Sequence, residues 1–358
     1  MNSPEEVNPF AFKEKPWSHH STVIWLGSTI TLSRNVEKFN FPGKLPIDKR
    51  NQILSLLTKG FLASGPLEHF RLIRPEEMSP FEKEYLMEHF LSHQSVYHAY
   101  TGEAFVVDQT GQFLAVLNLK DHLLLHWVDT QEELESAWNR LVNIEAEINK
   151  SVNFAFSPTF GFLTSDPHLC GSACVVTIFL HLPALIHTNH LDEVVNKYKG
   201  EGIEQTGLQG DPHELIGDIV AFHNRYTLGV TEENILSSLQ TLAIKLVLEE
   251  QGMRQHLKRG TEHEVAEMKN RVSRAYALLL HSYQIETIEA MHALSLVKLG
   301  FDLEWVKGGT QSIFNALLFN CRRGHLLCRD GGKINPEELP HRRAEYIHQA
   351  LHSLQLLI

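Results

Sequence analysis

The stretch "EAFVVDQTGQFLAVLNLKDHLLLHWV" (residues 103–128) decides the fold class expected for this chain. Most of its residues are aliphatic, aromatic or β-branched, and Gly111 marks a turn, so we predict two or three neighbouring strands. Within it, residues 118–127 alternate between polar and apolar side chains, as a half-buried strand does. Leu124 interrupts the polar face and Asp121 interrupts the apolar one. A leucine in the middle of a polar face therefore needs an explanation.

Strands and helices surround this stretch, and the pattern changes near residue 230. Strands are predicted within residues 21–32, 154–164, 174–182 and 216–228, and helices within 48–64, 79–93, 130–151 and 183–200. The helix at 79–93 is predicted to begin with a capping box, in which Ser79 is the cap, Pro80 takes the first helical position and Glu82 closes the box. Beyond residue 230 the spacing is mostly helical, with capping signals at Thr231, Thr261 and Ser312. The order predicts an irregular arm at 1–20, an α+β domain at 21–230 and a helical domain at 231–358.

Composition excludes several functional classes. With 358 residues and a formal net charge of −11, the chain is a poor match for a nucleic-acid or anionic membrane surface. The four cysteines have neither a disulfide framework nor a standard zinc spacing, so we expect reduced thiols and no metal site: Cys170, Cys174, Cys321 and Cys328. Because no leader or membrane-spanning run is apparent, we expect a cytoplasmic protein.

General motifs do not identify a function. The chain has no phosphate-binding G-x-x-x-x-G-K-[ST] sequence. His89 and His93 have the helical spacing of a zinc pair, but no glutamate follows the first histidine as a zinc protease would need. Composition and periodicity alone therefore indicate only a soluble α+β protein with a helical tail.

Several stretches, in order along the chain, are similar to motifs of the ATP:guanido phosphotransferase family, and within it to the bacterial protein-arginine kinases. "GSTITLSRN" (27–35) is similar to S-S-R-x-R-x-x-R-N, and "NLKDHLLL" (118–125) is similar to N-E-E-D-H-L-R. Residues 163–185 resemble the cysteine loop followed by L-H-L-P-A-L, and residues 210–229 resemble the G-E-G-S-E motif region. The helical tail matches as well, so the resemblance covers nearly the whole chain.

The resemblance implies a fold, a reaction and partners. The fold is the guanido-kinase catalytic fold, an antiparallel sheet flanked by helices, followed by an all-helical C-terminal domain. The reaction is phosphoryl transfer from Mg-ATP to arginine side chains of proteins. The implied partners are a small zinc-finger activator of these kinases and the Clp unfoldase machinery. The helical domain is expected to form a homodimer, for which the apolar stretches 278–280 and 294–297 are candidates.

Other residues occupy the positions of the family's phosphate-binding arginines. Arginine suits that role because its planar guanidinium binds phosphate bidentately and stays charged. Leu124 stands where the family has such an arginine, which explains the leucine on the polar face. The full set matched to nucleotide-binding positions or lying beside them is Ser28, Thr29, Thr31, Leu124, Val175, Thr206 and Gln209. Arg34 is retained, but it matches an arginine outside that set.

The acidic residues of the reaction are also largely replaced. Leu119 and Lys120 occupy the two glutamate positions of N-E-E-D-H, so the base is lost, and a lysine there would repel a guanidinium. Asp166 replaces the loop cysteine and brings negative charge toward the phosphates. Only Glu214, which matches the second substrate-clamping glutamate, is kept.

We therefore predict a pseudo-kinase that acts as a binding or regulatory module and needs no cofactor, with Mg-ATP bound only if the family activity is retained. Two alternatives stay open. An altered enzyme could use the groups Lys120, Asp121, His122, Asp166 and Glu214 on a less charged ligand. A still-active kinase could take its nucleotide arginines from Arg71, Arg74 and Arg140.

A regulatory motif is altered in the tail. The active bacterial enzymes carry R-D-x-x-R-A, which resembles a phosphoarginine-reading site. Residues 339–344 read "LPHRRA", so Arg343 and Ala344 remain while the leading Arg-Asp pair is lost. We predict a basic, solvated helix start here in preference to a working sensor.

Overall fold

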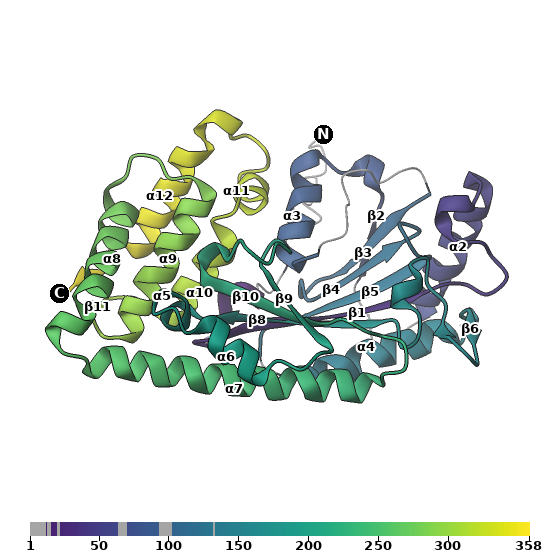
Figure 1. Ribbon diagram of the computed structural model, residues 1–358. Helices are drawn as coiled ribbons and strands as arrows, with labels where there is room; N and C mark the ends of the chain where they lie inside the picture. The colour runs from purple at the N-terminus through teal and green to yellow at the C-terminus, as the bar shows by residue number, and fades with distance from the viewer. Residues whose placement is uncertain (1–11, 13–15, 20–21, 64–69, 93–101, 132) are drawn as a thin grey trace, which may run out of the picture.

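A single large sheet organises the molecule (Figure 1). The computed structural model describes residues 12, 16–19, 22–63, 70–92, 102–131 and 133–358. Eight strands lie in the order β2-β3-β4-β5-β1-β8-β10-β9, and every neighbouring pair is antiparallel. Their bounds are β1 (Trp25–Arg34), β2 (Phe70–Ile73), β3 (Ala104–Asp108), β4 (Phe113–Leu117), β5 (Leu123–Asp129), β8 (Cys174–His181), β9 (Ile203–Gly207) and β10 (Ile219–Asn224). The expected antiparallel sheet is confirmed.

Helices cover both faces of the sheet and form most of the C-terminal region. Their bounds are α1 (Pro16–His19), α2 (Ile47–Ala63), α3 (Pro80–Phe90), α4 (Leu134–Asn149), α5 (Pro183–His187), α6 (Leu191–Tyr198), α7 (Glu232–Arg259), α8 (Glu262–His281), α9 (Thr287–Asp302), α10 (Gln311–Asn320), α11 (Arg323–Arg329) and α12 (Leu339–Leu351). Short two-residue strands complete the described chain: β6 (Phe156–Ser157), β7 (Gly161–Phe162), β11 (Val306–Lys307) and β12 (Gln355–Leu356).

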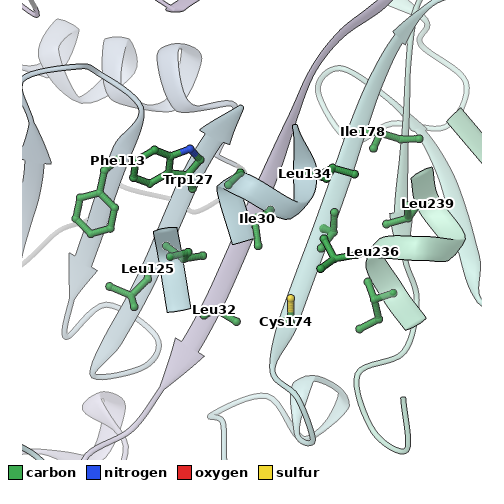
Figure 2. Packing of buried hydrophobic residues seen from close by; sticks show 14 of the residues in the cluster. Ile30, Leu32, Phe113, Leu125, Trp127, Leu134, Cys174, Ile178, Leu236 and Leu239 are labelled. Atoms are coloured by element: carbon green, nitrogen blue, oxygen red, sulfur yellow. The ribbon is translucent and has the colours of Figure 1, made fainter. Parts of the chain in front are cut away.

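The first hydrophobic core lies between one sheet face and α2, α4 and α7. Ile30 of β1, Leu125 of β5, Ile178 of β8 and Leu239 of α7 are fully buried members of this core (Figure 2). Burying one such side chain contributes about 1.5–3 kcal/mol. The long helix α7 belongs to this core although it begins beyond residue 230, so it anchors the helical region to the sheet.

The second core lies on the opposite sheet face. Phe90 of α3, Val128 of β5, Leu294 of α9 and Phe314 of α10 are members of one buried cluster. The C-terminal helices therefore share their core with the sheet. Within the described residues, none of the helices combines the length and the apolar composition that a bilayer crossing would require.

The start of α3 follows the sequence signal closely. The Ser79 hydroxyl accepts the Glu82 N–H, the Glu82 carboxylate accepts the Ser79 N–H at 2.7 Å, and Pro80 occupies the first helical position. The predicted capping box is confirmed.

The predicted strand at residues 118–127 is wrong in its first half. Residues 118–122 form the turn between β4 and β5, and the Asn118 N–H donates to the His122 carbonyl at 3.0 Å. Asn118 has φ +59°, a conformation that asparagine tolerates better than most residues. The turn residues 118–122 alternate in polarity as the strand residues do, so the sequence pattern does not show where the turn ends and β5 begins.

Other boundaries differ from the prediction. Strands β2 and β9 were not predicted, the helix expected at 183–200 is divided into α5 and α6, and residues 154–164 contain only the β6–β7 hairpin. Thr310, not Ser312, caps α10 by accepting the Ile313 N–H. The expected irregular arm at 1–20 falls mostly outside the described residues, and its described part includes the short helix α1.

Candidate functional site

Strand register places the residues matched to the family's arginines on one face of the sheet. Thr31 of β1 lies opposite Val175 of β8, and Leu124 of β5 lies opposite Ser33 of β1. Directly opposed residues of antiparallel strands share a face, and so do alternate residues of one strand. Thr29, Thr31, Leu124 and Val175 therefore face the same side, and they have this side in common with the second core.

Strand β9 brings Thr206 to the same face. Thr206 lies opposite Ala221 of β10, which lies opposite Phe179 of β8, two pairs along from Val175 on the same side of the strand. The positions selected from four separate strands therefore lie on one face of the sheet, with Thr206 at its far edge, beyond β10. On that surface they present hydroxyl and aliphatic groups.

This face is partly closed by α3. Thr29 and Leu124 are 4% and 8% exposed. The Thr31 hydroxyl is 2.8 Å from His126 Nδ1, and His126 Nε2 is 2.7 Å from the Phe90 carbonyl at the end of α3. Because a carbonyl oxygen only accepts, Nε2 carries the proton and Nδ1 accepts from Thr31. Thr31, which the sequence matches to an arginine position of the family, thus helps to attach α3 over the sheet.

His126 was not selected from the sequence. It occupies the same strand face as Leu124, two residues further along β5. That alternation was the available signal, but no family motif pointed to the residue.

Ser28 does not join this group. It alternates with Thr29 and Thr31 on β1, so its side chain lies on the opposite face, where its hydroxyl accepts the Trp25 Nε1–H at 2.9 Å. Ser28 is completely buried there.

The Asp-His pair of the turn is structural. Asp121 Oδ1 accepts from Asn35 Nδ2 and from the Ser165 N–H, both at 2.7 Å. His122 Nδ1 accepts the Val36 N–H at 2.9 Å, and burial lowers the pKa of the imidazole. These bonds tie the turn to the chain after β1 and to the cysteine-loop region.

Removing the Asp121 carboxylate should weaken the fold. Asp121→Ala leaves the Asn35 amide and the Ser165 N–H without their acceptor, so we expect the free energy of unfolding to fall by about 1–3 kcal/mol, measured by urea denaturation. Asp121→Asn keeps an acceptor oxygen and should lose less. Equal stability of Asp121→Ala and the unchanged chain would show that the turn does not depend on this carboxylate.

The remaining candidate acids and the replaced base are dispersed. Leu119 packs against the second core, whereas Lys120 is exposed in the turn. Asp166 is exposed and caps a short 3-10 helix by accepting the His168 N–H at 3.0 Å. Glu214 is exposed in the loop between β9 and β10, held close to Gly207, where an added Cβ would lie 1.9 Å from the Glu214 carbonyl oxygen. The groups required by an altered enzyme are thus either hydrogen-bonded within the framework or separated on the surface.

The three arginines considered as alternatives lie away from Thr31, Leu124 and Val175. Arg71 shares the sheet face but lies on β2, three strands from β5, or roughly 14 Å at the usual strand spacing. Arg140 lies on α4, with its guanidinium 5.7 Å from the Trp127 ring on the other face. Arg74 is exposed beyond the end of β2.

The prediction of a basic, solvated helix start at residues 339–344 is wrong for Arg343. It is 1% exposed, and its guanidinium donates from Nε to the Cys321 carbonyl and from Nη1 to the Ile285 carbonyl, both at 2.8 Å. Leu339, at the position of the motif's leading arginine, is buried against Leu326 and Leu327. Arg343 is therefore a structural tie between α12 and the preceding helices.

Thiol and metal chemistry receive no support from the described residues. The thiols of Cys170, Cys174 and Cys321 form no disulfide within the described residues, and burial raises the pKa of Cys174 to about 12. In the described ranges, three or more histidine, cysteine, aspartate or glutamate side chains do not gather as a metal ion would require.

The chain is similar to known proteins over nearly its whole length. Residues 54–253 match the family described as ATP:guanido phosphotransferase, C-terminal catalytic domain, and residues 265–356 match the protein-arginine kinase McsB C-terminal domain. The protein-arginine kinase of Chlamydia pneumoniae is 33% identical over 98% of this chain and 97% of its own length. That of Geobacillus stearothermophilus is 29% identical over 92% of this chain and 90% of its own length.

Solved structures share the fold at lower identity. A lombricine kinase has a TM-score of 0.57 at 16% identity, over 68% of this chain and 69% of that one. The substrate-free duplicated taurocyamine kinase from Schistosoma mansoni has a TM-score of 0.57 at 21% identity, over 72% of this chain and 38% of that one. At these identities the likeness concerns the fold.

Proposed function

The chain belongs to the ATP:guanido phosphotransferase family and resembles its protein-arginine kinases, and we propose that it is a pseudo-kinase that acts as a binding or regulatory module. In this proposal the fold is kept while phosphoryl transfer is lost. The supporting observation is the shared sheet face on which Thr29, Thr31, Leu124, Val175 and Thr206 replace arginines.

The main argument for the proposal is the lack of positive charge at these positions. Phosphoryl transfer depends on positive groups held around the transferring phosphoryl group, since the developing charge has to be stabilised in place. Hydroxyl and aliphatic side chains provide no such charge, and two of these positions, Thr29 and Leu124, are almost fully buried. Asp166 adds a negative group to the loop beside the old site.

The residues at the two positions matched to the family's glutamates support the same conclusion. The two glutamate positions are taken by a half-buried leucine, Leu119, and an exposed lysine, Lys120. Neither can accept a proton from a guanidinium at neutral pH, because leucine has no acceptor and lysine is normally charged. Glu214 alone could hold a substrate but has no partner acid from this turn.

The proposed partners rest on the family resemblance: a zinc-finger kinase activator, the Clp unfoldase machinery and a second copy of the chain bound through the helical region. For the homodimer, the exposure of side chains in the helical region limits which residues could form the contact. Leu279, Leu294 and Val297 are fully buried in the chain's own core, so a homodimer would have to use other residues. Tyr283 and Ile288, which are 75% and 49% exposed, are available for such a contact.

Nucleotide binding tests the proposal directly. With Mg-ATP or Mg-ADP at several millimolar, the thermal unfolding midpoint of the full chain should not change. In an active protein-arginine kinase measured alongside, ligand at about 100 times its dissociation constant adds roughly 2.7 kcal/mol and raises the midpoint. A comparable rise for this chain would mean that other groups form a phosphate site, and the pseudo-kinase proposal would then fail.

A further inference from the structure

The 28-residue helix α7, the longest in the described part of the chain, carries an exposed stripe without charged side chains. Ile244 and Leu248, at its centre, are 50% and 60% exposed. Its positions are spaced alternately four and three residues apart, and all are exposed: Ser237, Thr241, Ile244, Leu248, Gln251 and Gln255. This spacing places side chains along one helix face, as in a helix that packs against another helix. Because the outer face of a surface helix normally carries charged groups, the stripe has the character of a contact surface.

The charged residues on one flank of the stripe are engaged by the neighbouring helix α6, which lies beside α7 in Figure 1. Glu249 accepts the Tyr198 hydroxyl at 2.6 Å and Lys197 Nζ at 3.1 Å. Lys245 Nζ lies 5.4 Å from the centre of the Tyr198 ring. These contacts hold both charges of α7 toward α6, so that the stripe itself stays uncharged.

The two ends of α7 carry opposite charge. The first turn contains Glu232 and Glu233, and the last turn contains Lys258 and Arg259. A second α7 that runs in the opposite direction would set each acidic end beside a basic end, whereas a parallel one would set like charges together. The chain has a formal net charge of −11, so two copies repel each other over most of their surface. An antiparallel contact along α7 avoids that repulsion.

A two-fold axis that crosses α7 at Leu246 makes the stripe complementary to itself. Such an axis pairs residues that lie equally far from Leu246 in opposite directions along the helix. The pairs between the two copies are Ile244 with Leu248, Thr241 with Gln251, Ser237 with Gln255, and Glu233 with Arg259. Apolar side chains therefore meet apolar ones, hydroxyls meet amides, and an acid meets a base at each end. Every contact occurs twice, because a two-fold interface uses the same surface on both copies.

We propose that two copies of this chain associate through α7, packed antiparallel along this stripe. The surface differs from that of Tyr283 and Ile288, which lie beyond the far end of α8, a 20-residue helix about 30 Å long that begins just after α7. The inference rests on the proposed function only for the second copy as a partner. A chain without this contact could still lack phosphoryl transfer, which nucleotide binding tests separately.

The contact is small. Its apolar part consists of Ile244 and Leu248 from each copy, and the charged pairs at its ends lie at the rim, where they set the orientation and add little affinity. We therefore expect a dissociation constant in the micromolar range.

Analytical ultracentrifugation of the full chain over about 1–200 µM tests the proposal. Leu248→Glu sets a carboxylate against Ile244 of the other copy at two symmetric contacts; at about tenfold each, it should raise the dissociation constant about 100-fold and halve the mass of the assembly. Ile288→Glu is the matched control on α9, since Ile288 is also an exposed apolar residue, and it should leave the mass unchanged. A chain that stays monomeric throughout, or one that Ile288→Glu dissociates and Leu248→Glu does not, would overturn the proposal.

Gly252→Gln separates a blocked contact from a damaged fold. Gly252 lies beside the stripe, and the same axis pairs it with Gln240 of the other copy. In the single chain an added Cβ at Gly252 meets nothing within 4 Å, and replacing a glycine inside a helix by a good helix former stabilises the helix. The variant should therefore keep or raise the thermal unfolding midpoint of the monomer while weakening association about tenfold. Unchanged association would contradict the proposed packing.

Cross-linking tests the direction of the two helices. In the antiparallel dimer Ser237 of one copy faces Gln255 of the other, whereas the two Ser237 side chains lie roughly 27 Å apart along the helix axis. A short bismaleimide should therefore link a mixture of Ser237→Cys and Gln255→Cys, and neither variant alone beyond the background of the unchanged chain, in which Cys170 is half-buried. Efficient linking of Ser237→Cys to itself would indicate parallel helices and refute the assignment.

Discussion

Given Mg-ATP and an arginine-rich unfolded protein, this chain should form phosphoarginine at least about 10⁵-fold more slowly than an active protein-arginine kinase. A single transition-state arginine contributes about 10³–10⁵ in phosphoryl transfer, and a general base typically contributes about 10²–10⁴. Such losses are not additive, but the lower ends of both ranges already give 10⁵. The chain lacks arginine at five matched positions, which are Thr29, Thr31, Leu124, Val175 and Thr206.

Glu214→Gln supplies the control for that assay. Because Glu214 is the one retained clamping acid, trace turnover by the family mechanism should disappear in this variant, whereas turnover from a contaminating kinase should persist. Leu124→Arg restores one guanidinium and should leave the rate at background, since the base and the other arginines are still missing. Phosphoarginine formed at a rate near that of an active relative, and lost in Glu214→Gln, would show that the activity survives with a rebuilt phosphate site.

Local signals predicted the long elements of the fold well and the short ones poorly. Helix α3 was predicted with its cap because Ser79, Pro80 and Glu82 act within one turn. Strand β9 was missed because "IEQTG" has little strand character, and among the described residues it lies at the edge of the sheet, paired with β10. Pairing of this kind is set by a distant partner, which a local window does not contain.

The residues of the candidate site were likewise predicted in part. The family motifs selected Thr29, Thr31, Leu124, Val175 and Thr206 from separate strands, and strand register then brings them to one face. The wrong prediction for Arg343 has a different cause. A basic helix start normally lies in water, and burial of this guanidinium depends on the carbonyls of Ile285 and Cys321, far away in the sequence.

The largest stability effect should come from a buried ion cluster between the sheet and the helical region. Glu250 of α7 is completely buried; it accepts the N–H groups of Ala184 and Leu185 at 3.0 and 2.9 Å and pairs with Arg254 Nε at 2.7 Å. Arg254 also pairs with Asp302 of α9 at 2.6 Å. One guanidinium thus joins α7, α9 and, through Glu250, the start of α5.

Arg254→Met should lower the free energy of unfolding by about 3–5 kcal/mol, measured by urea denaturation. Methionine keeps much of the volume, so the loss comes from the buried carboxylate of Glu250, which is left without Arg254, and from Asp302, which keeps the more distant Lys298 Nζ at 3.9 Å. Arg259→Met is the matched control: it makes the same chemical change at the exposed end of the same helix and should alter stability by less than about 0.5 kcal/mol.

The double variant Arg254→Met, Glu250→Gln separates a lost attraction from an uncompensated charge. If the cost of Arg254→Met is mainly the charge left on Glu250, neutralising that residue should recover part of the loss, and the two effects should fail to add by about 0.5–3 kcal/mol. Full recovery is not expected, because Asp302 keeps its charge. Strict additivity would mean that Glu250 is stabilised by the Ala184 and Leu185 N–H groups alone, so that Arg254 acts chiefly through Asp302 in holding α7 against α9.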